Sequence, residues 1–387
     1  MDSFRPLLTH IGLLALVVCS LFVLVQFTRN TTPTISIPVA TTTEQTAAAA
    51  GISATTTPEV AATSTKIVAT STPAVAVVKK ASAGGTKSAS TSEAARVRNP
   101  YSTPPLSFDD INTSARQALV NILCMNGAGS LRPISGSGVI IDPRGVILTN
   151  AHVAQYVLLA QSGKVNLSCT VRTGSPAVAR WIPHVLYIPP VWLREHVTEI
   201  TTTHVLGTGE HDYALLVISS TVDGSPLPGS FHSIPPDTRE AIGFVGDQVL
   251  AASYPAEFLG GYATQSSLYT SSSIAAIKQL MTFSTKSVDV ISVGGTIQAQ
   301  AGSSGGAVIN AWGKLIGIIT TTSEGATTGE RDLRAVTLSY INRDLSAQKG
   351  LDLQLILGGD PAAQAADFAT REAPELIELL LKQIFRE

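Results

Sequence analysis

The chain has 387 residues, enough for two domains, and its 26 basic and 28 acidic side chains leave a formal net charge of −2. This balance argues against a nucleic-acid partner, which would require a basic excess. Hydrophobic residues make up 44% of the chain, but they are unevenly distributed, so each part of the sequence is considered separately.

The N-terminal part contains a long apolar run, LLTHIGLLALVVCSLFVLVQF at residues 7–27, without a formally charged side chain. As a helix this run would be about 31 Å long, the thickness of a bilayer hydrocarbon core. We therefore predict a membrane anchor at residues 1–29. A cleaved signal peptide is the competing interpretation because Arg5 precedes the run, although no small-x-small cleavage pattern follows. A buried core helix is a third.

Residues 30–105 consist almost entirely of Thr, Ala, Ser, Val and Pro, without a sustained apolar period. Such a segment cannot bury enough apolar surface to offset the entropy lost on ordering. We predict a disordered linker, of the kind that holds a domain away from a membrane.

Short β-rich runs separated by glycine and proline begin after Ser107, among them ISGSGVIID, DYALLVIS and RAVTLSYI. Many strands of four to eight residues predict an all-β sandwich or barrel, and the β-α alternation of a doubly wound sheet is absent. The segment FDDINTSARQALVNILCM is expected to open with a helical turn and to run into a strand, and a surface helix is expected in PPVWLREHVTEI. We place this domain at residues 106–350.

The last part of the chain, residues 351–387, is predicted to be a helical tail. Apolar side chains recur there at helical spacing, namely Leu376, Ile377, Leu380, Leu381 and Ile384. Such a stripe either docks on its own domain or mediates self-association.

Three segments contain the residue types of nucleophilic catalysis: His152 in LTNAHV, Asp212 in EHDYALLVI and Ser304 in AGSSGGAV. Each residue alone has an ordinary structural interpretation. The glycines around Ser304 free the backbone, so that a hydroxyl can project toward substrate while N–H groups converge on an oxyanion. A β-hairpin, VINAWGKLIGIITT, follows the serine, whereas a helix would follow in an α/β-hydrolase.

Together these segments resemble the trypsin-like serine peptidases of the chymotrypsin fold, nearest the bacterial HtrA branch, over about residues 114–345. GSGVIIDPRGVILTNAHV is similar to the family's entry to the catalytic histidine, and HDYALLVI to its aspartate strand. GDQVLAASYP looks like the start of its second barrel, and AGSSGGAVINAWGKLIGI like its nucleophile loop. The resemblance implies two six-stranded antiparallel β-barrels with the triad in the cleft between them. The chain departs from the HtrA pattern after Leu345, where about 40 residues remain, so a C-terminal helix and no PDZ domain are expected.

The resemblance also implies a role for each residue of the site. Ser304 attacks the scissile carbonyl, His152 takes and later returns the proton, and Asp212 orients the imidazole. The backbone N–H groups of Gly302 and Ser304 form the oxyanion hole. The hydroxyl of Thr320 lies where the family places one against the buried aspartate.

The wall of the substrate pocket is expected to contain Gln298, Ala299, Thr320, Thr321 and Thr322. None of these residues is acidic, so we expect small or medium apolar residues at the cleavage position. The family usually has Asn or Asp at Ser303, and a serine cannot form the ion pair that activates animal zymogens. Activation by insertion of a new N-terminus is therefore not expected.

Two cysteines, Cys124 and Cys169, lie in strands that resemble the first and fourth strands of the N-terminal barrel. These strands are neighbours, so a disulfide can form in an oxidising compartment, and two free thiols are the equal alternative. His196 and Glu199 have a spacing that could suggest a metal, but no second pair accompanies them, so no metal is expected.

The sequence thus predicts a membrane-anchored serine endopeptidase that hydrolyses peptide bonds in extracytoplasmic proteins or peptides, without metal or organic cofactor. We expect a single pass through the cytoplasmic (inner) membrane, with the peptidase domain on the extracytoplasmic side. The main alternative is a catalytically silent peptidase-fold binding module or adhesin, which the presence of all three triad residues disfavours.

Overall fold

The structure is a computed structural model of the chain. It describes residues 100–127, 131–202, 207–259, 261–283, 286–323 and 325–385. The predicted anchor at residues 1–29, and the predicted linker up to residue 99, lie outside these ranges. Within them, no helix has both the length and the apolar character needed to cross a bilayer.

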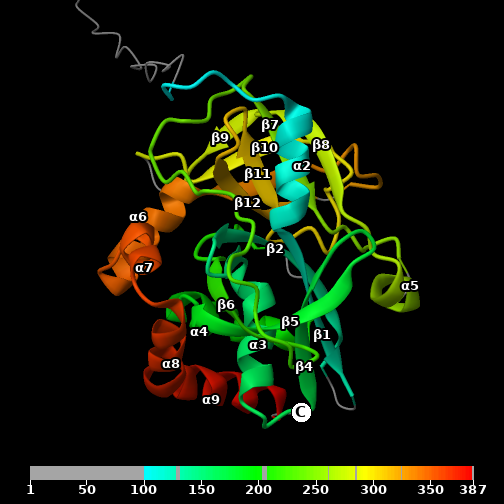
Figure 1. The fold of residues 1–387 in the computed structure, drawn as a ribbon, viewed down its shortest axis with the longest axis vertical. Helices are drawn as coiled ribbons and strands as arrows, with labels where there is room; N and C mark the ends of the chain where they lie inside the picture. The colour runs from blue at the N-terminus through cyan, green and yellow to red at the C-terminus, as the bar shows by residue number, and fades with distance from the viewer. Residues whose placement is uncertain are drawn as a thin grey trace, which may run out of the picture. The chain divides into compact units, whose positions relative to one another are not determined.

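The first β-unit is a closed antiparallel barrel with the strand order β1-β2-β3-β6-β5-β4 (Figure 1). Because the ring closes, each strand has a hydrogen-bonded neighbour on both sides and no edge is left open. This finding confirms the first of the two predicted barrels. Its strands are β1 (Leu119–Asn126), β2 (Ile134–Asp142), β3 (Val146–Thr149), β4 (Leu167–Thr173), β5 (Val178–Tyr187) and β6 (Ala214–Thr221).

A disulfide joins Cys124 and Cys169 across this barrel. The two residues are direct partners in the β1–β4 ladder, and their Cα atoms are 4.0 Å apart. Of the two alternatives that the sequence left open, the structure therefore contains the paired one.

The second β-unit corrects the prediction of a second six-stranded barrel, because it is an open seven-stranded sheet in the order β8-β7-β11-β12-β13-β10-β9. The edge strands β8 and β9 are joined by Ile277 and Lys278 alone, so the sheet has to curl until its edges approach. Lys278 donates its N–H to Ser292 O of β10 at 2.7 Å, and no ladder forms between β8 and β9. The strands are β7 (Gln248–Ser253), β8 (Ser271–Ala276), β9 (Gln279–Met281), β10 (Val290–Gly294), β11 (Ala307–Asn310), β12 (Leu315–Thr322) and β13 (Leu333–Thr337).

Helices before and between the strands follow local sequence signals. Ser107 caps the first one, since its hydroxyl accepts the N–H of Asp110 at 3.1 Å, and the helix leads directly into β1, as predicted. The predicted surface helix exists as α4 and the 3₁₀ turn η1, but Trp192 and Leu193 of α4 are buried. These helices are α2 (Phe108–Ala118), α3 (Ala151–Gln161), α4 (Pro190–His196), η1 (Val197–Thr201) and α5 (Gly261–Ser266).

The C-terminal part is more helical than the sequence indicated. The run RAVTLSYI was predicted as one strand, but β13 ends at Thr337, whose hydroxyl accepts the N–H of Tyr340 at 3.1 Å and starts α6. The helices after it are α6 (Leu338–Lys349), α7 (Leu353–Gly358), α8 (Pro361–Arg371) and α9 (Ala373–Ile384).

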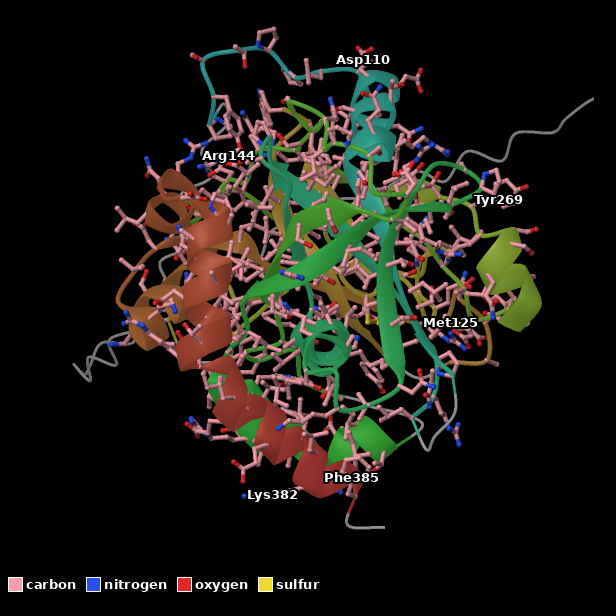
Figure 2. All side chains as sticks on the ribbon, turned by 60° about the horizontal axis from the view of Figure 1, so that its bottom comes forward. Asp110, Met125, Arg144, Tyr269, Lys382 and Phe385 are labelled. Atoms are coloured by element: carbon pink, nitrogen blue, oxygen red, sulfur yellow. A yellow bond between two sulfur atoms is a disulfide. The ribbon has the colours of Figure 1, made fainter. Side chains whose placement is uncertain are left out.

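The apolar stripe of α9 packs on its own domain. Leu376, Leu380 and Ile384 are buried in the barrel's hydrophobic cluster, while Lys382 lies on the outer side of the helix (Figure 2). Docking on the domain is thereby confirmed, and self-association stays a prediction.

The end of the predicted linker already contacts the domain. Tyr101 packs against Trp312 with ring centroids 5.0 Å apart, and its hydroxyl donates to Asp237 Oδ2 at 2.5 Å. The indole Nε1 of Trp312 donates to Thr103 O at 2.9 Å. Residues 100–105 therefore belong structurally to the domain.

Candidate active site

Strand pairing brings His152 and Asp212 together. His152 begins α3 just after β3, Asp212 precedes β6, and β3 and β6 are antiparallel neighbours. His152 Nδ1 lies 2.8 Å from Asp212 Oδ2, and the His152 backbone N–H donates to Asp212 Oδ1 at 3.0 Å. Both carboxylate oxygens thus hold the histidine, which leaves its Nε2 available for proton transfer.

Asp212 is almost fully buried and has further hydrogen-bond donors. The hydroxyl of Thr320, from the curled sheet, donates to Asp212 Oδ2 at 2.9 Å. The side-chain amide of Asn150 donates to the Asp212 backbone carbonyl at 2.7 Å. Burial by itself raises the pKa of Asp212, but the charge and hydrogen bonds of His152 and the hydroxyl of Thr320 outweigh it and lower that pKa. The carboxylate is therefore ionised at neutral pH.

The same pair has the opposite effect on the pKa of His152, which is raised. Burial by itself lowers the pKa of His152, but the charge and hydrogen bond of Asp212, with a smaller contribution from the charge of Glu199, raise it above its ordinary value. An imidazole in this setting is a stronger base, and the imidazolium that it forms is stabilised by a fixed anion.

Ser304 lies in the turn before β11, where contacts from both β-units hold the backbone. Gly305 N–H donates to Ile319 O at 2.7 Å within the sheet, and the backbone N–H of Ser137, from the barrel, donates to Ser304 O at 2.7 Å. Ser304, His152 and Asp212 line one small cavity of about 70 Å³. Among the described residues no hydrogen bond joins the Ser304 hydroxyl to His152. In ligand-free sites this bond often forms only with substrate bound.

Two N–H groups of the serine loop have no acceptor. Along residues 301–306 the N–H groups of Ala301, Ser303, Gly305 and Gly306 all donate within the protein. Those of Gly302 and Ser304 do not donate to any residue in the described part of the chain. Alternating N–H groups of a tight turn can converge on one point, which is the geometry of an oxyanion hole.

The orientation of the Gly302 N–H is fixed by its own peptide plane. The carbonyl of Ala301 accepts from Ala256 N at 2.9 Å, so the N–H of Gly302 points in the opposite direction within the same peptide plane. Gly302 has a φ of 90°, and a Cβ there would lie 2.8 Å from Ala256 Cβ and 2.9 Å from Tyr254 O. Only glycine fits this position.

The predicted pocket residues do not all line the cavity. Gln298 and Ala299 are fully buried and do not line the 70 Å³ cavity. Gln298 donates from its Nε2 to Ser271 Oγ at 3.0 Å, and its Oε1 is buried without a partner among the described residues. Thr320 is engaged with Asp212, as the resemblance implied. The side chains of Thr321 and Thr322 lie outside the described part of the structure.

Ser303, the residue that departs from the family pattern, is buried. Its hydroxyl accepts a hydrogen bond from Ser253 Oγ at 2.9 Å. This neutral pair occupies the position in which a zymogen-type activation needs a carboxylate, so Ser303 provides no acid for an ion pair.

Sequence reasoning missed several residues of this region. Asn150 stands in the same TNAHV segment as the histidine, and that proximity was the available signal. The hydroxyl of Ser137 donates to Gly302 O at 2.7 Å. Only the three-dimensional structure shows that this residue reaches the serine loop. His196 and Glu199 were considered as metal ligands, but they line the cavity beside His152.

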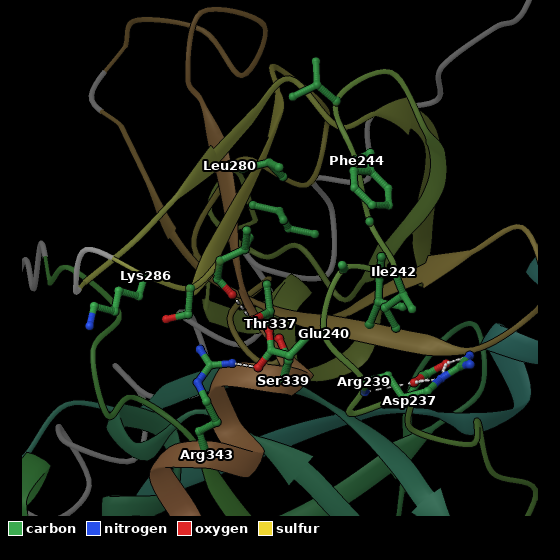
Figure 3. A pocket seen from close by; sticks show the side chains of 17 residues that line it. Asp237, Arg239, Glu240, Ile242, Phe244, Leu280, Lys286, Thr337, Ser339 and Arg343 are labelled. Carbon is green, nitrogen blue, oxygen red and sulfur yellow. Dashed lines mark hydrogen bonds and ion pairs between the residues drawn. The ribbon is translucent and has the colours of Figure 1, made fainter. Parts of the chain in front are cut away.

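A far larger cavity, of about 1210 Å³, lies elsewhere, in the curled sheet (Figure 3). Its walls include Ile242, Phe244 and Leu280, and at one end Arg343 contacts Glu240. It contains none of the residues around Ser304. The size of a cavity therefore does not identify the candidate active site here, whereas the convergence of a base, a buried acid and a hydroxyl does.

The family match agrees with this geometry. Residues 136–318, which contain His152, Asp212 and Ser304, match the trypsin-like peptidase domain family. Among solved structures, a serine endoprotease from Yersinia pestis is similar at 22% identity, covering 64% of this chain and 69% of that chain with a TM-score of 0.39. No curated protein matches the chain.

Proposed function

Because this chain is a serine peptidase with a trypsin-like domain, we propose that His152, Asp212 and Ser304 are its catalytic triad and that it cleaves peptide bonds within protein substrates. The observation that carries the assignment is the buried His152–Asp212 pair at 2.8 Å, which lines one cavity with Ser304.

In the proposed first step the Ser304 hydroxyl attacks the scissile carbonyl. His152 takes the hydroxyl proton on Nε2 and then gives it to the leaving amine, which leaves an acyl group on Ser304. Water deacylates the enzyme by the same route, with His152 again acting first as base and then as acid. Asp212 stays ionised throughout and holds the imidazole in the tautomer that has its proton on Nδ1.

The oxyanion of each tetrahedral intermediate is proposed to accept from the free N–H groups of Gly302 and Ser304. These donors are held in place before substrate binds, so little reorganisation is needed in the transition state. A single such donor contributes about 3–4 kcal/mol in related sites.

We also propose that the chain is anchored in the cytoplasmic membrane by residues 7–27, with the domain on the extracytoplasmic side. The support is the length and apolar character of that run and the Cys124–Cys169 disulfide, since disulfides persist mainly in oxidising compartments. Protease protection of intact spheroplasts tests the topology. Digestion of the domain by added protease only after lysis would contradict it.

The nucleophile assignment is tested by fluorophosphonate labelling of the full-length chain. Wild type and the Ser230→Ala control, which removes an exposed serine, should label, and Ser304→Ala and His152→Ala should not. Labelling that survives Ser304→Ala contradicts the assigned nucleophile. A folded wild-type chain that takes no label contradicts the triad and favours a silent binding module.

A further inference from the structure

The cavity beside His152 has a wall that the proposed triad does not use. It is formed by α4 and η1, from the segment PPVWLREHVTEI that was predicted to be a surface helix. Trp192 and His196 of α4 and Glu199 of η1 line the same 70 Å³ cavity as His152 and Ser304. A segment that reaches the reacting residues is placed to contact substrate.

This wall is rigidly built. The imidazole of His196 stacks on Trp192 with ring centroids 4.9 Å apart and an interplanar angle of 13°. His196 Nδ1 lies 2.8 Å from Glu199 Oε1, so one oxygen of the carboxylate is held. Ile200 of η1 is buried, and α9 packs against both η1 and α4. The C-terminal helices thus support the wall from behind.

The other oxygen of the carboxylate has no partner among the described residues. Glu199 Oε2 is buried and accepts no hydrogen bond from the part of the chain that the structure describes, although the side chain as a whole is 27% exposed. A buried carboxylate oxygen without a donor is costly, and a donor or a cation that reaches it from the cavity removes that cost. The free oxygen therefore favours a ligand that brings its own N–H groups and positive charge.

The charge around the cavity points to the same ligand. Glu210 is a second carboxylate in its lining, and no lysine or arginine is among the described lining residues. The field of Glu199 also reaches the catalytic imidazole. Burial lowers the pKa of His152, Asp212 raises it most, and Glu199 raises it further. A wall of this charge attracts a cation and repels a carboxylate.

Resting on the proposed peptidase function, we propose that Glu199, oriented by His196, forms a substrate subsite beside His152 that selects a lysine or arginine side chain next to the cleaved residue. In an extended peptide, successive side chains point to opposite sides. When the cleaved residue faces the serine-loop side of the cleft, the residue before or after it faces the wall that contains Glu199. The subsite is separate from the pocket that receives the cleaved residue.

The test compares cleavage of matched peptides by the full-length wild-type chain and by Glu199→Gln. The peptides share one cleaved residue and carry Lys, Arg, Gln or norleucine at either flanking position. We expect wild type to cleave the Lys and Arg peptides with about tenfold higher kcat/KM at one of these positions, the ratio of a single charge-assisted hydrogen bond. Glu199→Gln should remove the preference, and the control Glu195→Gln, an exposed acid of the same segment, should keep it.

Other results overturn the subsite. Equal rates for all four peptides in the wild type do so without any variant, and this comparison stands even if Glu199→Gln fails to fold. A Glu199→Gln variant that slows every peptide by the same factor shows that Glu199 only positions His152. Fluorophosphonate labelling separates the two proposals. If the chain is labelled but shows no preference for Lys or Arg, only the subsite is contradicted. If the chain is neither labelled nor active, the peptidase assignment itself is contradicted.

Discussion

The closed barrel and the curled sheet satisfy their strand edges in different ways. In the barrel every strand pairs on both sides, and the Cys124–Cys169 disulfide adds a covalent link between β1 and β4. The sheet keeps two edge strands, β8 and β9, and its curl depends on the short connection between them. The barrel is thus closed by backbone hydrogen bonds between all neighbouring strands, whereas the sheet is not closed by a ladder between its edge strands.

This difference matters because the proposed triad is divided between the two units. His152 and Asp212 belong to the barrel, at the ends of the paired strands β3 and β6. Ser304 belongs to the sheet, and the barrel residue Ser137 holds its loop through two hydrogen bonds of 2.7 Å. One hydrophobic cluster contains Val139 of the barrel and Ile309 of the sheet, so the two units share part of their core. The position of the nucleophile is therefore set at the junction between the barrel and the sheet.

The largest expected effect tests whether the two units act as one catalytic device. His152→Ala removes the base from the barrel and Ser304→Ala removes the nucleophile from the sheet, and each should lower kcat by about 10⁶-fold. The double variant should be no slower than either single variant, because the residues act as a unit. Steady-state hydrolysis of a peptide substrate measures this, and additive losses would show that the residues work independently.

The next largest effect is expected from removing the disulfide, the additional constraint of the barrel. Replacing both Cys124 and Cys169 by Ala opens a loop of 45 residues and should lower the free energy of unfolding by about 4 kcal/mol in the chain-entropy treatment. Hydrogen exchange should rise more in β1 and β4 than in β11 and β12. Activity at low temperature should persist, since neither cysteine lines the cavity. Equal gains in exchange across both units would contradict a barrel-specific constraint.

The sequence predicted the barrel better than it predicted the sheet, and the proposed triad stays a prediction. Segments such as LTNAHV and HDYALLVI combine a strand pattern with the residue that follows or precedes it, so local order was enough to place His152 and Asp212. The curl of the sheet depends on long-range pairing, and strand β9 has only three residues. A periodicity of two cannot be recognised over so short a run.

The residues that complete the site were hidden for a related reason. Ser137 looks like an ordinary strand residue, and its hydroxyl matters only because the two units meet there. Glu199 lies in the segment PPVWLREHVTEI, which was predicted to be a surface helix, yet its neighbour Ile200 is buried. Contacts between distant segments decide these positions, and a single sequence does not contain them.

A smaller effect is expected at the junction itself. Ser137→Ala removes a buried hydroxyl that donates to Gly302 O at 2.7 Å and accepts from Tyr254 N at 2.9 Å. Losing these bonds should cost about 2 kcal/mol of stability, and the less constrained Gly302 should lower kcat more than it raises KM. Ser135→Ala, two residues earlier in the same strand, is the matched control. A change in KM alone would place Ser137 in substrate binding instead.

The smallest effect concerns the contact between the C-terminal helices and the barrel. His211 directly precedes Asp212, has a φ of 57°, and its Nδ1 lies 3.0 Å from Asp344 Oδ2 of α6, with Tyr340, Gln348 and Glu210 also close. The hydrogen bond of Asp344 raises the pKa of His211, although burial opposes the shift.

A histidine whose pKa is raised on folding stabilises the protein fully below its unfolded pKa of about 6.5, and this contribution is lost as pH rises through the folded pKa. Asp344→Asn should therefore lower the free energy of unfolding by about 1 kcal/mol at pH 5.5 and by much less at pH 9. Urea unfolding at both pH values measures the difference. Asp367→Asn, an exposed acid of α8 paired with Arg371, should show no such pH dependence. An equal cost of Asp344→Asn at both pH values would mean that α6 holds the Asp212 loop through packing, without the charge of His211.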